Sequence, residues 1–352
     1  MFLKFKRAIA KAKFSSGIDL GTHSIKALRL KLLSSGRGNL PAPQASGEAA
    51  GLCWFALEPA QPDTAAVLKK IKQAQGPAMD NPNIALCGPS TVIRYINFPK
   101  MSKDELKQAL KFEAQKHIPF ALAEVNLDSC ILRSDLPDNK MLVMVAVAKK
   151  DFVKERLKVI EDAGLKVGML SMDSVALANA FNFNYADEEG ARNKSLALLN
   201  IGASYTNLNI LESGIPRLSR DIHIAGNNFT QKIMDIFALD FKAAESLKIS
   251  PDSQRQEKVK AGVDSVLSGL ATEIRTSFDY YESQTTASVA RIYLSGAGSL
   301  FPGLKDMLAN LVGIEVEYWD PLKKISIAGN LDSAQLKAAS AQLAVAVGLA
   351  LF

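Results

Sequence analysis

A pattern of strand, glycine turn and strand occurs twice in this chain, once at the start of each half. The first copy reads GIDLGTHSIKALRL over 17–30, and the second reads LLNIGASYTNLNIL over 198–211. In both copies a polar residue stands two positions before the glycine, and hydroxyl-bearing residues follow it. Because a repeat reflects a repeated structural unit, we expect two similarly built halves, each opened by a β-hairpin.

The glycine of each turn permits a positive φ angle and a close approach of the backbone to a ligand. Residues 21–24 (GTHS) and 202–204 (GAS) also present backbone N–H groups and hydroxyls, which together can cradle a phosphate. One such turn on its own is most often only a hairpin turn. Two of them predict a cleft that holds a polyphosphate from both sides, although His23 is equally compatible with a plain polar turn residue.

Length and composition restrict the class of protein. The 352 residues suit two domains or one bilobed unit, at about 150 residues for a domain. Hydrophobic residues make up 48% and charged residues 22%, which excludes wholesale disorder and a rod-like fold. Basic residues outnumber acidic ones by 42 to 36, and five of them lie within 4–13. The rest of the chain is nearly neutral, so no nucleic-acid binding is expected.

Cysteines and histidines give no sign of a metal site. The three cysteines lie far apart and, like the three histidines, lack ligand spacing, so we expect a reduced cytosolic protein without a structural metal. No apolar run reaches the ~18 residues of a membrane-spanning helix, and no secretory signal is recognisable.

The N-terminal residues 1–15 instead form a basic amphipathic pattern. Phe2, Phe5 and Ile9 share one helical face, with lysines and an arginine around them. Such a segment is predicted to lie on an anionic membrane surface, or else to be a solvated tail.

Hydrophobic periodicity divides the first half into strands and helices. Ser102 and Glu105 form a capping box that begins one helix, and Gly164 supplies the left-handed residue that ends another. Residues 34–62 are rich in glycine, proline and serine and are expected to be a long loop or an extended hairpin tip. The predicted strands lie at 16–20, 25–33, 83–100, 141–147 and 167–170, and the predicted helices at 63–74, 102–116, 151–163 and 174–183.

A polar break at 187–190 separates the two halves. The repeat of Phe229, Ile233 and Phe237 at every fourth position indicates the first helix of the second half. Strands are predicted there at 195–201, 206–211, 217–223, 291–295 and 315–318, and helices at 227–238, 259–284, 303–311 and 334–351.

Several segments carry a resemblance to a known superfamily. The two hairpins, IHIAGNNFTQKIM at 222–234 and RIYLSGAGSLFPGL at 291–304 resemble, in kind and in order, the phosphate, connecting and adenosine motifs of actin-like ATPases. FEAQKHIPFALAEVNLD at 112–128 does not belong to actin itself and is similar to the PilM family, the cytoplasmic actin-like proteins of type IV pilus assembly. Shorter matches lie at 163–168, 173–181 and 219–227.

The resemblance implies an α/β, bilobed actin-like ATPase fold, with duplicated ribonuclease-H-like lobes and the subdomain 1C that PilM shares with the division protein FtsA. Lobe I would span 16–188, with 1C inserted at about 97–165. Lobe II would span 189–352, with subdomain 2B at about 227–285. The C-terminal helix at 334–351 would pack back on lobe I.

The resemblance also implies an ATP and Mg²⁺ site between the lobes. Asp19 would hold Mg²⁺ through water, the 296–298 and 226–227 backbone would approach the ribose and phosphates, and Glu245 and Lys248 would flank the adenine. A Glu and a Lys three apart on a helix could also be only a surface pair. The implied set is Asp19, Gly21, Thr22, His23, Ser24, Asn200, Gly202, Ala203, Ser204, Gly226, Asn227, Glu245, Lys248, Gly296, Ala297 and Gly298.

Hydrolysis has less support than binding. Many actin-like ATPases have a second acid where this chain has Asn200, whose amide keeps an oxygen but no charge. One carboxylate is then left near the metal, and no residue is evident to orient the attacking water. We therefore expect ATP binding with weak or no ATPase activity, and assign no catalytic residue.

The same resemblance implies an adaptor at the cytoplasmic face of the inner membrane. PilM proteins bind the short N-terminal peptide of the bitopic membrane protein PilN between subdomains 1A and 1C, which places a groove here between 84–98 and 106–119. Other pilus assembly proteins, the membrane and further copies of the chain are additional expected contacts.

Two alternative functions remain on sequence grounds. An FtsA-like filament protein would end in an amphipathic membrane helix, whereas 345–352 is uniformly apolar. A sugar or acetate kinase of the same superfold would need a catalytic carboxylate and a polar substrate cleft, whereas the inserted region offers an IPF loop and apolar strands.

Overall fold

The computed structural model describes residues 14–32, 50–79, 81–188 and 194–352. Nearly all of the predicted basic segment, and residues 34–49 of the predicted long loop, lie outside these ranges. No helix within them combines the length and apolarity needed to cross a membrane. The described strands form three sheets, of six, five and three strands.

The first sheet is built around the first repeated hairpin. β1, β2 and β3 pair antiparallel, and the other strands join parallel to their neighbours in the order β14-β3-β2-β1-β4-β8. The strands are β1 (Phe14–Leu20), β2 (Ser24–Leu32), β3 (Ala50–Pro59), β4 (Asn83–Leu86), β8 (Leu170–Met172) and β14 (Ile325–Ile327). Because β14 comes late in the sequence, the chain returns to the first sheet after building the second.

Two sequence expectations about this sheet are wrong. Residues 50–59, inside the predicted loop, form β3, because buried Leu52 and Trp54 alternate with less buried neighbours and give the strand one apolar face. The strand expected at 167–170 forms instead at 170–172, where all three side chains are buried.

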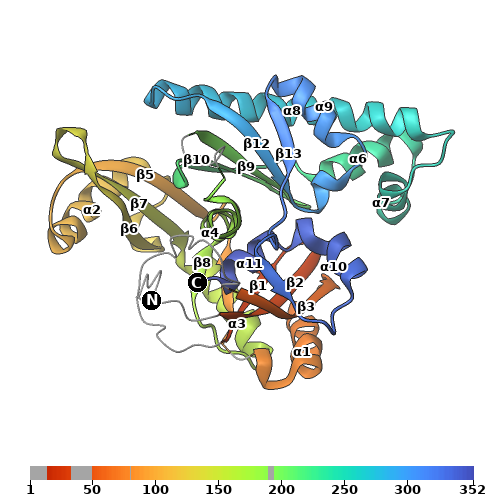
Figure 1. Ribbon diagram of the computed structural model, residues 1–352, viewed down its shortest axis with the longest axis horizontal. Helices are drawn as coiled ribbons and strands as arrows, with labels where there is room; N and C mark the ends of the chain where they lie inside the picture. The colour runs from red at the N-terminus through yellow and green to blue at the C-terminus, as the bar shows by residue number, and fades with distance from the viewer. Residues whose placement is uncertain (1–13, 33–49, 80, 189–193) are drawn as a thin grey trace.

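Helices cover both faces of the first sheet (Figure 1). The one closest to β1 is α11, since a Cβ added to Gly17 would lie 2.2 Å from the Ala346 carbonyl oxygen. On one face lie α1 (Thr64–Gln75) and α3 (Lys150–Asp162), and on the other α4 (Asp173–Tyr185) and α11 (Ala344–Ala350). Residues 150–162, within the region expected for subdomain 1C, thus pack on the first sheet.

The single helix predicted at 334–351 is interrupted. α10 spans Ser333–Ala339, a 3₁₀ turn follows, and α11 begins at Ala344. The Ala341 carbonyl accepts the N–H of Gly296 at 2.7 Å, so it does not continue an α-helical ladder. A tertiary contact therefore sets the break.

The second sheet repeats the order of the first sheet without its edge strand β14. It runs β11-β10-β9-β12-β13, with the second repeated hairpin, β9–β10, in the place of β1–β2, and with two parallel strands after it. The strands are β9 (Ser195–Ile201), β10 (Thr206–Glu212), β11 (Ile215–Ile222), β12 (Val289–Ser295) and β13 (Glu315–Tyr318). The predicted duplication of the lobes is confirmed.

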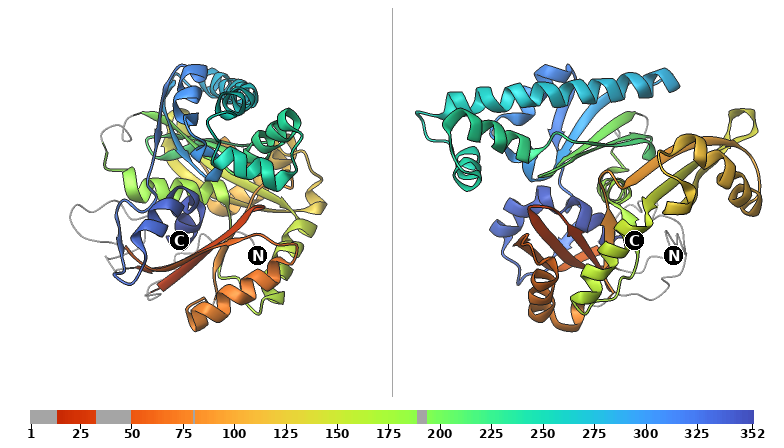
Figure 2. Two further views of the ribbon diagram at one scale, coloured as in Figure 1. Left: turned by 90° about the vertical axis from the view of Figure 1, so that its right-hand side faces the viewer. Right: turned by 180° about the vertical axis from the view of Figure 1, so that it is seen from behind.

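The long α8 crosses the second sheet and is visible from the front and from behind (Figures 1 and 2). It shares one apolar core with the sheet and three shorter helices. Of these, α7 was not predicted, and it begins where the Asp240 carboxylate accepts the N–H of Ala243 at 2.7 Å. The helices are α6 (Gly226–Phe237), α7 (Phe241–Ile249), α8 (Gln256–Gln284) and α9 (Leu304–Val312).

A third unit projects from the side of the two lobes (Figure 2). Its small antiparallel sheet, β5-β7-β6, packs one face against α2. The predicted capping box is confirmed, because Ser102 and Glu105 each accept the backbone N–H of the other.

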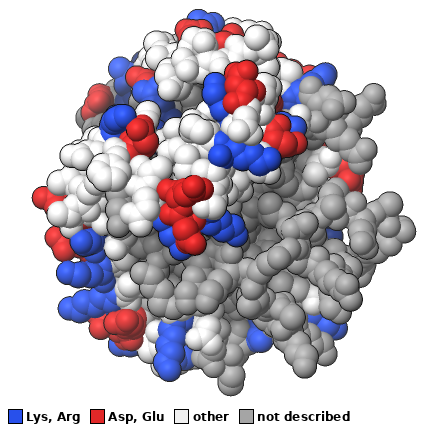
Figure 3. All heavy atoms as spheres, turned by 90° about the vertical axis from the view of Figure 1, so that its left-hand side faces the viewer, with Lys and Arg blue, Asp and Glu red and all other residues white. Residues whose placement is uncertain are grey.

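Figure 3 views the molecule from the side of this third unit and shows basic and acidic side chains intermixed over the described surface. The elements are β5 (Thr91–Pro99), α2 (Lys103–His117), β6 (Val125–Leu136) and β7 (Lys140–Lys149).

Candidate nucleotide site and an adjoining cavity

A cavity of about 600 Å³ lies between the two lobes. Its volume is in the range of small-molecule sites. All residues of the predicted nucleotide set line it, although they come from separate loops of the two lobes. The structure therefore brings together Asp19, Gly21, Thr22, His23, Ser24, Asn200, Gly202, Ala203, Ser204, Gly226, Asn227, Glu245, Lys248, Gly296, Ala297 and Gly298.

The two repeated turns meet across this cavity. Thr22 Oγ1 and Ser204 Oγ are 2.8 Å apart and exposed to solvent. Each hydroxyl comes from the turn after the first strand of its lobe. A polyphosphate bound here would therefore contact both lobes at once.

Lys26 is a cavity residue that the sequence analysis missed. It lies opposite Asp19 in the β1–β2 register, and its Nζ is 3.1 Å from Asp19 Oδ2. A Cβ on Gly21 would lie 2.6 Å from the same Nζ, so a side chain there would displace the ammonium group. The antiparallel pairing of the first hairpin could have revealed Lys26, since residues directly opposite each other share one face of a sheet.

Glycines allow three loops of the second lobe to pack backbone against backbone. The N–H groups of Gly226 and Asn227 donate to the carbonyls of Gly202 and Ala203 at 3.0 and 2.8 Å. A Cβ on Gly298 would lie 2.9 Å from the Gly202 carbonyl oxygen. The beginning of α6 is thus hydrogen-bonded directly to the turn at 202–204. We call this turn and its counterpart at 21–24 the phosphate-type turns.

Glu245 and Lys248 are not a surface pair. Lys248 is 8% exposed, and its Nζ donates to Glu245 Oε2 at 2.7 Å and to Thr230 Oγ1 at 2.8 Å. Burial raises the pKa of Glu245, but the hydrogen bonds from Lys248 and Thr230 outweigh it and hold that pKa below its usual value. The pair therefore anchors α7 to α6 at the cavity wall, beside the apolar side chains of Ile249 and Leu300.

Asp173, at the start of α4, is a third carboxyl group in the cavity, in addition to those of Asp19 and Glu245. The sequence analysis did not single out this group. Burial and then the negative charge of Asp221 raise the pKa of Asp173 well above its usual value. Because α4 follows a strand of another part of the sheet, only the folded topology places Asp173 beside Asp19.

Further cavity residues were also not singled out from the sequence. Burial, followed by the nearby Asp173, raises the pKa of the Cys87 thiol, which therefore stays protonated. The guanidinium of Arg156 lies 5.1 Å above the ring of Phe152 on the same helix. Besides Lys26 and Asp173, the additional polar lining includes Cys87, Ser90, Arg156, Tyr205, Asn207 and Gln342.

The chemistry of this lining fits a magnesium-bound polyphosphate. No group of three or more acidic, histidine or cysteine side chains in the described parts of the chain could hold a metal alone. A magnesium ion would therefore need water and phosphate oxygens as its remaining ligands beside Asp19. Asn200 also lines the cavity, and its Oδ1 accepts a hydrogen bond from Ser295 Oγ at 3.2 Å.

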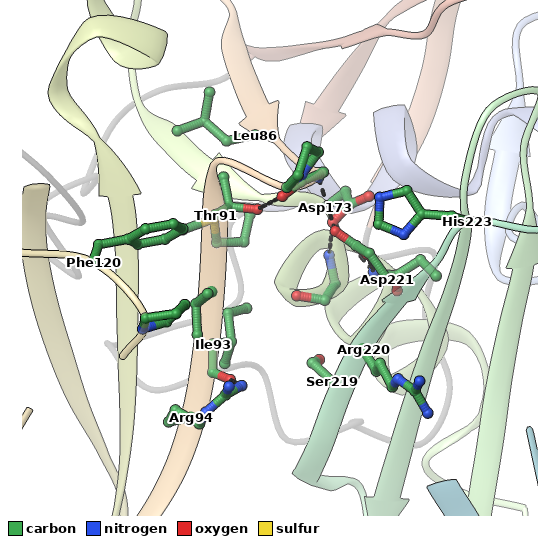
Figure 4. Close-up of a pocket in the computed structure, with 17 residues that line it drawn as sticks. Leu86, Thr91, Ile93, Arg94, Phe120, Asp173, Ser219, Arg220, Asp221 and His223 are labelled. Atoms are coloured by element: carbon green, nitrogen blue, oxygen red, sulfur yellow. Dashed lines mark hydrogen bonds between the residues drawn. The ribbon is translucent and has the colours of Figure 1, made fainter. Parts of the chain in front are cut away.

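A second cavity, of about 270 Å³, adjoins the first (Figure 4). Its apolar wall includes Leu86, Ile93 and Phe120, and its polar wall includes Arg94 and Asp221. Of the two walls predicted for the peptide groove, 84–98 contributes many residues, whereas 106–119 contributes only Pro119. The opposite side comes from β11, which the sequence analysis did not foresee.

Comparisons with known proteins agree with this geometry. The family model for "Type IV pilus assembly protein PilM" matches residues 17–352. The structure of a PilM–PilN type IV pilus biogenesis complex is similar, with 27% identity, coverage of 96% of this chain and 97% of that chain, and a TM-score of 0.80. The ethanolamine utilization protein EutJ from Carboxydothermus hydrogenoformans shares the fold, with 16% identity, coverage of 96% and 89%, and a TM-score of 0.54. The chain therefore has the bilobed actin-like fold and belongs to the PilM family of type IV pilus assembly proteins.

Proposed function

We propose that this protein is an ATP-binding adaptor of type IV pilus assembly that binds the cytoplasmic N-terminal peptide of PilN. The observation that carries the proposal is the meeting of two duplicated phosphate-type turns over one cavity in a chain of the PilM family. The similar structure of a PilM–PilN complex supports PilN as the partner.

Each part of the large cavity suits one part of Mg²⁺·ATP. The turns at 21–24 and 202–204 offer N–H groups and hydroxyls to the phosphates, and Asp19 would hold Mg²⁺ through water. Lys26 supplies a positive charge beside them. The apolar side chains of Ile249 and Leu300 suit the flat face of the adenine.

The proposed activity is binding with slow or no hydrolysis. Asn200 brings no charge, and its oxygen already accepts a hydrogen bond from Ser295. Asp173 retains its proton to a higher pH than an ordinary aspartate, so a smaller fraction of it is in the carboxylate form that could accept a proton from water. Turnover near ~10 s⁻¹, the median for enzymes, would contradict this part of the proposal.

The small cavity is the proposed site for the PilN peptide. Ile93 and Phe120 offer an apolar wall, while Arg94 and Asp221 can satisfy polar groups of an extended segment. Since PilN is a membrane protein, the adaptor would work at the cytoplasmic face of the inner membrane. Contacts with other assembly proteins and self-association belong to the same proposal.

The peptide site can be tested with two phenylalanines of the small unit. Phe120 lines the cavity, whereas Phe112 on α2 is 74% exposed and does not. Phe120→Ala should weaken binding of a synthetic PilN N-terminal peptide about tenfold in calorimetry. Phe112→Ala is the matched control and should bind like the wild type. Unchanged affinity in Phe120→Ala would place the peptide elsewhere.

A further inference from the structure

Three lysine and arginine side chains in the described part of the chain line the large cavity, and two of them have an acidic partner. Lys26 pairs with Asp19, and Lys248 pairs with Glu245. The third, Arg156 on α3, is half-buried, and among the described residues no carboxylate lies within ion-pair distance of its guanidinium. Of the three cations, Arg156 is therefore the one left to neutralise a negatively charged ligand.

Packing holds Arg156 at the cavity wall before any ligand is bound. Its guanidinium lies 5.1 Å above the ring of Phe152, one helical turn earlier on α3, and Phe152 also lines the cavity. The beginning of α3 is tied to the loop after β4, because the N–H of Lys149 donates to the Ser90 carbonyl at 2.9 Å. The positive charge is thus supported by the fold rather than carried on a free surface side chain.

The thiol of Cys87 shows which part of the wall Arg156 occupies. Burial raises the pKa of this thiol most, nearby acidic side chains raise it further, and Arg156 lowers it. Cys87 comes directly after the last residue of β4. Because β4 pairs parallel to β1, this end of β4 lies beside the phosphate-type turn at 21–24. Arg156 is therefore close to the first of the two turns.

The second sheet shows that this is the end of the cavity opposite to the proposed adenosine site. Gly88, in the loop after β4, donates its N–H to Asp221 of β11 at 2.8 Å. The strand order places β11 on one side of β9 and β12 on the other, with the turn at 202–204 directly after β9. The loop at 296–298, which would approach the ribose, follows β12. The phosphate-type turns therefore lie between the adenosine end and Arg156.

We propose that Arg156 binds the terminal phosphate of the nucleotide and so makes the large cavity prefer ATP to ADP. The inference rests on the proposed function and adds a nucleotide specificity to it. A guanidinium presents several N–H donors in one plane, which match phosphate oxygens and form charge-assisted hydrogen bonds with them. ADP ends one phosphate earlier and leaves the guanidinium without this partner. The two lysines of the cavity discriminate less, because carboxylates already neutralise them.

The test compares the binding of ADP and of a non-hydrolysable ATP analogue with a β,γ-imido bridge, both with magnesium, by calorimetry. The wild type should bind the analogue at least about tenfold more tightly than ADP. Arg156→Gln keeps a polar side chain over Phe152 but removes the charge, so the analogue should lose about tenfold in affinity while ADP stays within about twofold. Arg156→Lys, which restores a positive charge, should recover part of the preference.

Lys158→Gln is the matched control, because Lys158 is exposed on the same helix and does not line the cavity. It should bind both nucleotides like the wild type. Equal binding of the two nucleotides by the wild type would overturn the inference alone, since the cavity would still hold a nucleotide. An unchanged preference in Arg156→Gln, or the same loss for both nucleotides, would also overturn it. Failure of the wild type to bind either nucleotide would overturn the proposed function, and this inference with it.

Discussion

At the residue scale, Asp19 is the side chain on which the nucleotide proposal depends most. Its carboxylate is mostly buried beside Lys26 and is the acid placed for magnesium at the phosphate-type turns. Asp19→Ala should weaken Mg²⁺·ATP binding by about tenfold or more, since the carboxylate that would hold magnesium through water is lost. Calorimetry of the purified variant measures this. Asp135→Ala, an exposed acid on β6, is the control, and equal affinities would reject the assignment.

Asp128 gives a prediction about pH. Burial raises its pKa from the usual 3.8 to about 6, although the Ser129 N–H donates to it. Between pH 4 and 6 the unfolded chain loses the Asp128 proton while the folded protein keeps it, which favours unfolding. The contribution of Asp128 to the free energy of unfolding is therefore complete below pH 4, falls between pH 4 and 6, and is lost above 6. Because the Asp128 carboxyl is half-buried and screened by solvent, Asp128→Asn should raise the free energy of unfolding by only about 1 kcal/mol at pH 7.5.

Urea unfolding at pH 4 and at pH 7.5 tests this sign. Wild type and Asp128→Asn should differ little at the lower pH, with the variant more stable at the higher one. Asp135→Asn on the same strand should match the wild type at both. A variant that is less stable than the wild type at pH 7.5 would contradict the prediction.

The residues of the large cavity differ in how visible they are in the sequence. Asp19 and Gly21 stand in a contiguous motif that the second half repeats, so the turn chemistry alone identifies them. Lys26 requires the hairpin register, and Asp173 and Asn207 require the full topology, because they lie on elements that reach the cavity only after folding. Local patterns thus reveal the phosphate-type turns but not the wall that they share with the second cavity.

At the scale of elements, local sequence was sufficient where one apolar face or one cap defines the structure. The capping box at Ser102 and the strand at 195–201 formed as predicted. β3 was missed because its alternation is short and follows a segment rich in glycine and proline. The break between α10 and α11 was missed because it depends on the Gly296 N–H, a contact from a distant loop.

The contact between α11 and α4 allows a sharp test of packing. A Cβ on Gly348 would lie 1.8 Å from the Ala176 carbonyl oxygen, so the two helices would have to separate. Gly348→Ala should destabilise the protein by about 3 kcal/mol, measured by urea unfolding. Gly329→Ala is the control, since nothing lies within 4 Å of its added Cβ. Equal unfolding midpoints would mean that the helices are not held this closely.

At the scale of the whole molecule, the repeated hairpin correctly predicts the duplicated lobes, since the five strands of the second sheet match in order five of the six strands of the first. It says nothing about how β11 closes the small cavity. That wall arises from the placement of the small sheet beside the second lobe, where Tyr95 meets Ser219. Contacts between units of a molecule leave no periodic trace in the sequence, and therefore the relation between the two cavities emerged only from the structure.

The charge distribution of the whole chain predicts that it associates with membranes. Five basic residues lie within 4–13, and the rest of the chain is nearly neutral. Near an anionic surface each basic residue contributes about 1 kcal/mol, and Phe2 and Phe5 add apolar contact. Deleting residues 1–13 should therefore reduce cosedimentation with vesicles containing anionic lipid, while Mg²⁺·ATP affinity stays unchanged.

Salt and lipid composition distinguish electrostatic adsorption from other causes of that binding. Binding of the full chain should weaken as ionic strength rises from 0.01 to 1 M, because the screening length falls from about 30 to about 3 Å. Neutral vesicles should bind full-length and truncated chains equally weakly. If the truncated chain cosediments with anionic vesicles as strongly as the full chain, residues 1–13 are not the segment that binds the membrane, and the prediction is wrong.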